Sequence, residues 1–205
     1  MLLEAERVAV DLDGSTLLPE TTLRVQPGEC VAVLGANGAG KTTLLRVLAG
    51  RLPPSSGRVH LSGAPLRERD TRVRRAIAAL IDPPTLYPDL TLRENLALIE
   101  AAWSGDHPSL GIAALDVFGL QDLALRFANE LSSGQRQLAS LAVTFARPAH
   151  ILLLDEPEQR LDPDRRSLLA QAMRTARSRG VAVVFASHAP DLVDQVADRA
   201  VRISP

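Results

Sequence analysis

The chain has 205 residues, of which 46% are hydrophobic and 23% charged, and its formal net charge is −1. This profile is typical of a globular protein with one large domain, or one domain carrying a small lobe. A charge so close to zero gives no electrostatic case for nucleic acid as a partner. No run of about 18 apolar residues occurs, so we expect no direct membrane insertion. The single cysteine excludes an internal disulfide and suits a reducing cytoplasm.

Residues 1–34 are predicted to form an antiparallel, strand-rich start. Turn signals stand at Asp13-Gly14 and at Pro27-Gly28. An apolar strand is expected over residues 30–34, and a helix is expected soon after it. The stretch between them is rich in glycine.

That stretch, residues 35–43, reads Gly-Ala-Asn-Gly-Ala-Gly-Lys-Thr-Thr and matches the GxxxxGK[ST] pattern of phosphate-binding loops. Glycines let successive N–H groups turn toward an anion, and the helix that follows adds its positive dipole end. We expect Lys41 to reach the terminal phosphates and the Thr42 hydroxyl to ligate Mg²⁺. The predicted nucleotide-binding residues are Gly35, Ala36, Asn37, Gly38, Ala39, Gly40, Lys41, Thr42 and Thr43.

The middle of the chain changes character twice. A short strand is expected over residues 58–61, the arginine-rich residues 67–75 are interpreted as a solvated face, and residues 77–81 form another apolar strand. Residues 91–128 then read as helical, with a capped helix through residue 103 and two further amphipathic segments. The amphipathic segments lie near residues 110–118 and 120–127. We interpret this region as a helical lobe inserted into an α/β body.

The last third returns to α/β order, with strands expected at residues 151–154, 181–186 and 199–203 and helices at 163–179 and 190–198. The first of these strands ends in Asp155-Glu156, at the edge where α/β sheets bind ligands. Asp155 is predicted to hold Mg²⁺ and Glu156 to polarise the water that attacks a γ-phosphate. Alone, such a pair is usually a polar loop; together with the phosphate loop, the functional interpretation is favoured.

Residues 131–135, Leu-Ser-Ser-Gly-Gln, stand before a helix and resemble the LSGGQ signature of ATP-binding-cassette (ABC) ATPases. The resemblance covers the whole chain: residues 35–42 match the family's Walker A, and residues 151–156 match its Walker B with Glu156 as catalytic glutamate. Leu161-Asp162 matches the end of its D-loop, and His188 its switch histidine. The resemblance implies an α/β P-loop NTPase fold of ABC type over residues 1–205, with an antiparallel β subdomain at the N-terminus and a helical subdomain inserted at about residues 91–146.

The resemblance also implies a function. Such a cassette binds ATP with Mg²⁺ and packs head to tail against a second cassette, itself or a paralogue. ATP then lies between one Walker A and the partner's signature, so nucleotide contacts are implied for Ser132, Ser133, Gly134 and Gln135, and for Asp162. Hydrolysis drives a membrane permease, which implies a cytoplasmic protein held at the inner face of the cell membrane. We expect an export system.

The chain departs from the family's pattern at several positions. Leu12 stands where an aromatic residue usually stacks on adenine, and Arg160 is a bulky cation before the D-loop Leu-Asp. Leu138 and Val143 occupy positions where arginines are common, and Ser133 replaces the first signature glycine. These changes concern the geometry of the interface with the partner cassette.

Asp82 replaces the Q-loop glutamine. An acidic residue there resembles the variant found in cassettes of antimicrobial-peptide immunity and bacitracin-type export. We expect Asp82 to act as a catalytic residue and as a ligand of Mg²⁺, because a carboxylate is a hard oxygen ligand. The alternative is that it only starts the Pro83-Pro84 turn.

Two rival functions stay open, and a third is disfavoured. The chain resembles the short cassette of the haem exporter used in cytochrome c maturation, and a non-transport ABC ATPase acting on ribosomes or DNA is a second alternative. A kinase or GTPase with the same phosphate loop is disfavoured, because residues 131–135 and His188 would then have no role.

Overall fold

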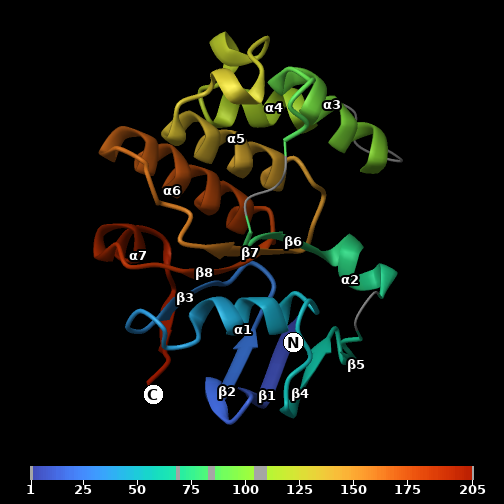
Figure 1. The fold of residues 1–205 in the computed structure, drawn as a ribbon, viewed down its shortest axis with the longest axis vertical. Helices are drawn as coiled ribbons and strands as arrows, with labels where there is room; N and C mark the ends of the chain where they lie inside the picture. The colour runs from blue at the N-terminus through green and yellow to red at the C-terminus, as the bar shows by residue number, and fades with distance from the viewer. Residues whose placement is uncertain (1, 68–69, 83–85, 104–109, 205) are drawn as a thin grey trace.

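The computed structural model describes residues 2–67, 70–82, 86–103 and 110–204. Two sheets and several helices are stacked in layers along the long axis (Figure 1). From bottom to top in the figure these are an antiparallel sheet, a single helix, a parallel sheet, two long helices and a helical lobe. The part of the chain that the structure describes contains no helix with the length and apolar character needed to cross a bilayer.

An antiparallel sheet forms at the start of the chain, as predicted. Residues 30–34, however, belong to the parallel sheet, and the antiparallel sheet also takes in two strands up to Pro65. Its strand order is β2-β1-β4-β5, and Leu3 pairs with Val25 on one side and with Leu61 on the other. Every second residue at the start of β1 is buried, so one face of the sheet packs on the core. The strands are β1 (Leu3–Leu12), β2 (Ser15–Val25), β4 (Ser56–Leu61) and β5 (Ala64–Pro65).

The second sheet is parallel and has the order β6-β7-β8-β3-β9. Its central strands are buried along nearly their whole length, which explains their unbroken apolar sequences. Parallel strands end at the same edge, so the segments that follow β3, β7 and β8 meet there. The strands are β3 (Cys30–Leu34), β6 (Ile77–Leu80), β7 (Ile151–Asp155), β8 (Ala182–Ala186) and β9 (Arg199–Arg202).

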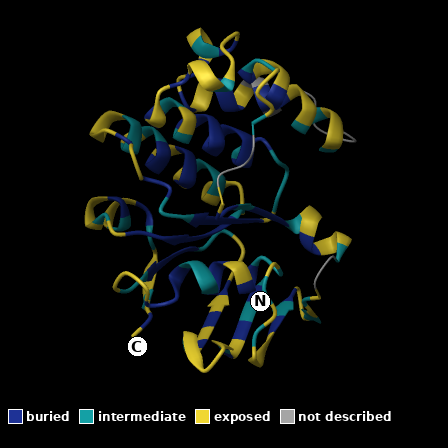
Figure 2. Ribbon diagram, in the orientation of Figure 1, coloured by how far each residue is buried: buried dark blue, intermediate teal, exposed yellow. Residues whose placement is uncertain are grey.

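Helices cover both faces of the parallel sheet. Helix α1 (Lys41–Leu48) lies between the two sheets, whereas α5 (Ser133–Phe145) and α6 (Pro163–Ser178) cover the opposite face (Figure 1). The short helix α7 (Pro190–Val196) connects β8 to β9. The buried residues accordingly form two cores, one on each side of the parallel sheet, visible as dark blue layers in Figure 2.

The helical lobe contains α3 (Leu92–Trp103) and α4 (Leu110–Val117) and packs on α5. The prediction of an amphipathic segment over residues 120–127 was wrong as a helix: only a 3₁₀ turn at Gln121–Leu123 forms there, and a second at Ala128–Glu130. The backbone instead pairs with the start of α3, since the amides of Leu92 and Arg93 donate to the carbonyls of Arg126 and Ala124.

The described residues of the arginine-rich stretch, 67 and 70–75, are largely exposed, as expected for a solvated face (Figure 2). It also contains an unexpected short helix, α2 (Thr71–Ala76), whose N-cap is Asp70. Two positions on α5 where the resemblance led us to expect arginines are occupied by Leu138 and Val143. Both are buried in the core between the parallel sheet and the helices α5 and α6. Their apolar character therefore serves packing in this chain.

Candidate nucleotide site

A cavity of about 650 Å³ opens where the loops after β3, β7 and β8 meet. The phosphate loop and α1 form its floor, and the hairpin of the antiparallel sheet contributes one wall. Ten residues line it: Thr16, Leu17, Asn37, Gly38, Gly40, Lys41, Thr42, Thr43, Glu156 and His188. Eight of the ten are predicted nucleotide or catalytic residues, and they come from three separate parts of the sequence.

The phosphate loop depends on glycine for its shape. Gly38 has φ +79° and Gly40 has φ +103°, values that residues with a side chain rarely adopt. A Cβ on Gly40 would lie 2.6 Å from the carbonyl oxygen of Leu17, so the loop touches strand β2. Gly40 is the N-cap of α1 and offers no side-chain cap, which leaves amides of the first helical turn available to an anion.

Lys41 is the only lysine in the sequence, and it is 6% exposed. Its Nζ donates hydrogen bonds of 3.0 Å to the carbonyl oxygens of Gly35 and Ala36. The ammonium is therefore folded back onto its own loop beside the cavity. Phosphate oxygens offer a stronger, charge-assisted partner for the same three protons.

The Thr42 hydroxyl donates a 2.6 Å hydrogen bond to Oδ2 of Asp155, joining the phosphate loop to the end of β7 across 113 residues. Asp155 Oδ1 is buried and has no hydrogen-bond partner among the described residues. Burial raises the pKa of Asp155, while the Thr42 hydrogen bond opposes this and the Glu156 charge adds to it. A desolvated carboxylate with a spare oxygen is stabilised by a cation.

These residues fit Mg²⁺. Among the residues described, no cluster of three or more His, Cys, Asp or Glu side chains could hold a metal ion by itself. Mg²⁺ rarely needs one, because it is usually bound by one or two carboxylates together with substrate phosphates. Thr42 and Asp155 supply such a set beside the phosphate loop.

Glu156 and His188 both line the cavity and lie side by side. His188 Nε2 lies 3.3 Å from Oε1 of Glu156, and the Gln159 amide donates to the other carboxylate oxygen. The Glu156 backbone has φ +44°, and its N–H donates to the Ala186 carbonyl at 2.9 Å. A non-glycine residue held in this region is frequent at functional sites.

One buried acid in this region was not among the predicted site residues. Glu158 is 6% exposed and accepts hydrogen bonds from the Ser187 hydroxyl and the His188 amide. The only available sequence signal was a second glutamate two positions after Glu156. Leu17, which lines the cavity, was also missed.

The signature residues do not reach this cavity within one chain. Ser132 is the N-cap of α5, where its hydroxyl and the Gln135 side chain form a reciprocal capping box. None of residues 132–135 is among those that line the cavity. Asp162 is likewise a cap, of α6, and accepts the Arg165 amide at 2.9 Å.

The signature helix rests on the loop between β7 and α6. Gln137 Nε2 donates a 3.0 Å hydrogen bond to the carbonyl of Pro157. A Cβ on Gly134 would lie 2.8 Å from the carbonyl oxygen of Arg160. Arg160 itself is exposed and has φ +63°. The close approach requires glycine at position 134.

Two other positions lie outside the cavity lining. The Asp82 side chain is 62% exposed and pairs with Arg46 at 3.0 Å and with Arg51 at 3.8 Å. The Arg46 charge also lowers the pKa of Asp155, and Asp82 is linked to the site through this arginine. The prolines after Asp82 lie outside the described residues. Leu12 ends β1 and is 58% exposed.

Comparison with known proteins identifies the family. The family model described as "ABC transporter" matches residues 18–159. The chain belongs to the ABC transporter family.

The cassette is 36% identical to the phosphate import ATP-binding protein PstB 2 of Natronomonas pharaonis, over 95% of this chain and 74% of that protein. It is 32% identical to the Nod factor export ATP-binding protein I of Burkholderia thailandensis, over 96% of this chain and 66% of that protein. A solved ATP-binding subunit of an ABC transporter superposes with a TM-score of 0.88 and 27% identity, covering 99% of this chain and 86% of the other.

These comparisons confirm the ABC-type P-loop fold and the resemblance stated from the motifs. A dimeric cassette bound to ADP and Pi has the same fold, with a TM-score of 0.88 at 22% identity. The chain is thus an ABC-type ATPase. Its relatives serve both import and export.

Proposed function

We propose that this cassette powers a separate membrane permease by binding and hydrolysing ATP with Mg²⁺. The observation that carries the proposal is the 2.6 Å bond between Thr42 and Asp155, which places a spare carboxylate oxygen beside the phosphate loop. Glu156 and His188 line the same cavity. These contacts support a nucleotide site, a metal position and a candidate base in one cavity.

Phosphate binding falls to the glycine loop, the first turn of α1 and Lys41. The loop offers backbone N–H groups, and the lysine exchanges its two carbonyl partners for phosphate oxygens. Thr42 and Asp155 would hold Mg²⁺, which neutralises charge that develops on the phosphates.

Hydrolysis requires a water molecule aimed at the γ-phosphorus. The Glu156 carboxylate is the acceptor available for the proton of that water, while the bond between γ-phosphorus and the bridging oxygen breaks and ADP leaves. His188 lies within 3.3 Å of this carboxylate and orients it. The imidazole also presents an N–H to the γ-phosphate once the nucleotide is bound.

A second cassette completes the site. Residues 132–135 cap α5 and lie outside their own chain's cavity, which suits contact with the nucleotide of a partner. The partner is a second copy or a paralogue, and the exposed Arg160 requires an acidic or open surface there. We expect the purified chain to be monomeric or weakly associated and slow as an ATPase.

We also propose that the permease holds the cassette at the cytoplasmic face of the membrane and that transport is directed outward. Relatives support ATP-powered transport in both directions; export is proposed from the acidic residue at position 82. The alternatives are a cassette like that of the cytochrome c haem exporter, or a non-transport ABC ATPase. Co-purification from detergent-solubilised membranes separates a transporter subunit from an ATPase without a permease.

Glu156→Gln tests the chemistry. We expect ATP affinity to be kept, turnover to fall by about 10²–10⁴-fold, and an ATP-bound dimer to accumulate on a sizing column. Glu20→Gln, the same chemical change on the exposed edge of β2, is the matched control and should turn over normally. Near-normal turnover of Glu156→Gln would exclude Glu156 as the base. A tight symmetric dimer would exclude an obligatory paralogue.

A further inference from the structure

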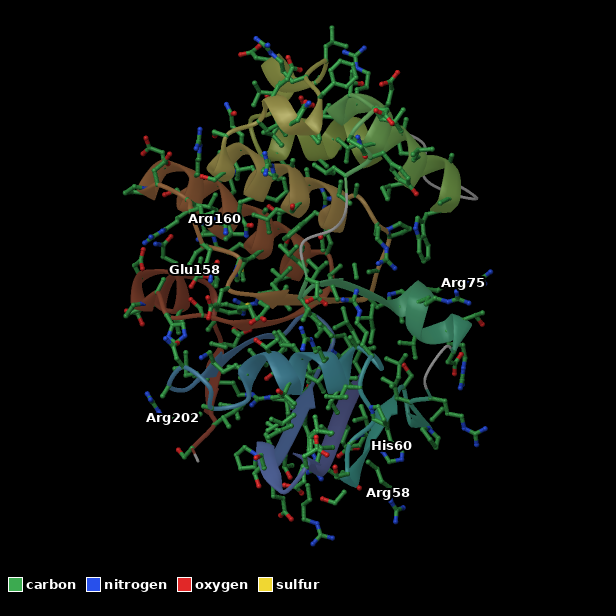
Figure 3. All side chains as sticks on the ribbon, viewed as in Figure 1. Arg58, His60, Arg75, Glu158, Arg160 and Arg202 are labelled. Carbon is green, nitrogen blue, oxygen red and sulfur yellow. The ribbon has the colours of Figure 1, made fainter. Side chains whose placement is uncertain are left out.

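Glu158 is buried in a place that the cavity does not reach. It lies in the loop between β7 and α6, is 6% exposed, and is labelled in Figure 3 near the ends of α6 and α7. Carboxylates are seldom this buried unless their oxygens accept hydrogen bonds. Its partners therefore indicate what the side chain does.

Both partners belong to the loop after β8. The Ser187 hydroxyl donates to Glu158 Oε1 at 2.5 Å, and the His188 backbone N–H donates to the same oxygen at 3.1 Å. The Ser187 oxygen in turn accepts the Ala189 N–H at 3.0 Å. A single carboxylate oxygen thus holds two consecutive residues directly, and a third is held through the Ser187 hydroxyl.

The residue in the middle of this loop is His188, whose imidazole lies 3.3 Å from the Glu156 carboxylate. The Glu156 N–H donates to the carbonyl of Ala186, the last residue of β8, so the loops after β7 and β8 are also joined beside Glu156. The position of the imidazole depends on its main chain. Glu158 holds that main chain through its hydrogen bonds with the His188 N–H and the Ser187 hydroxyl.

We propose that Glu158 is a positioning residue for hydrolysis: it holds the main chain of His188 so that the imidazole meets Glu156. This inference rests on the proposed function of Glu156 and His188. The other oxygen, Oε2, is buried and has no partner among the described residues. Glutamine keeps the accepting oxygen at position 158, whereas alanine and methionine remove it.

The test measures kcat and KM for ATP with the purified chain, at a protein concentration where the rate per chain has levelled off. Glu158→Ala should lower kcat by about 10–100-fold, because a misplacement near 1 Å costs up to about 10²-fold, with KM nearly unchanged. Glu158→Gln should restore kcat to within about threefold of the original. Glu29→Ala is the matched control, since Glu29 also accepts a loop amide, from Gln26 at 2.8 Å, outside the cavity.

A double-mutant cycle separates positioning from general destabilisation. If Glu158 acts through His188, Glu158→Ala should cost nothing further in a His188→Ala background. An equal loss in both backgrounds, or a Glu158→Ala kcat matching that of Glu29→Ala, overturns the proposal. If alanine does not fold, Glu158→Met fills the volume without an acceptor, and failure of both to fold overturns it too.

Glu156→Gln is run in the same assay. Unchanged turnover for that variant means that the proposed function fails. If Glu156→Gln abolishes turnover and Glu158→Ala leaves kcat unchanged, only the proposed role of Glu158 fails.

Discussion

The contact between the phosphate loop and strand β2 can be tested with two glycines that differ in one respect. Gly38 and Gly40 both have positive φ, but a Cβ on Gly38 meets nothing within 4 Å, whereas a Cβ on Gly40 lies 2.6 Å from the Leu17 carbonyl. Gly38→Ala therefore adds backbone strain alone. Gly40→Ala adds strain and a collision with main chain that no side-chain rotation relieves.

The expected magnitudes follow from these distances. Strain at Gly38 should cost about 1–2 kcal/mol of unfolding free energy. At Gly40, strain of about 1–3 kcal/mol and overpacking of about 1–3 kcal/mol act together. For a chain of this size each kcal/mol lowers the melting temperature by about 2–4 °C. Gly40→Ala should thus melt several degrees below Gly38→Ala.

Urea unfolding followed by circular dichroism measures the two free energies. The slope of the free energy with urea should be the same in both variants, because both remain folded and expose similar surface on unfolding. Equal losses for the two alanines would refute the close approach of the phosphate loop to β2. A smaller loss at Gly40 would refute the geometry of the loop as well.

Three further outcomes are expected. Burial, with a smaller contribution from Asp198, raises the pKa of Cys30 from 9.0 to about 12. Because the folded state favours the protonated thiol, this shift stabilises the fold fully below pH 9, and the stabilisation is lost as the pH rises through 12. Iodoacetamide at pH 8 should therefore alkylate Cys30 only after unfolding. Lys41→Ala should weaken ATP binding by about 10–150-fold, as for loss of a hydrogen bond to a charged group. ATP should also protect this single lysine from an amine-reactive probe. Unchanged ATP affinity, or unchanged labelling with ATP present, would contradict the role of Lys41. Asp82→Gln should shift the Mg²⁺ dependence of ATP hydrolysis in the assembled transporter, and Asp82→Ala should uncouple hydrolysis from transport. If both variants keep the original curve of ATPase rate against Mg²⁺ and intact transport, Asp82 is only a turn residue paired with Arg46.

The sequence allowed most of the sheets to be predicted, because each central strand is an apolar run closed by a turn or a polar pair. It also predicted Thr42 and Asp155 as ligands of Mg²⁺, and the two side chains are hydrogen-bonded at one edge of the parallel sheet. The segment over residues 120–127 was misjudged because its backbone pairs with the start of α3, a contact between residues distant in sequence. Helical periodicity contains no information on such pairing.

The role of Glu158 was beyond sequence reasoning for a similar reason. Its two donors come from a loop about 30 residues away, and an acid after Glu156 gives no sign of being buried. Leu17 was missed because the resemblance drew attention to Leu12, at the other side of the hairpin. Only the packing of the phosphate loop on β2 shows which leucine faces the cavity.

The seating of α5 on the loop after β7 has a mechanical consequence. The Gln137 side chain donates a hydrogen bond to the Pro157 carbonyl, and the backbone at Gly134 lies too close to Arg160 for any side chain to fit between them. Pro157 is the residue next to Glu156, so we expect any displacement of α5 to reach the carboxylate that we propose as the base of the same chain. If a permease moves α5, we expect two places to change together: the signature residues at the start of α5 and the position of Glu156 in the chain's own nucleotide site.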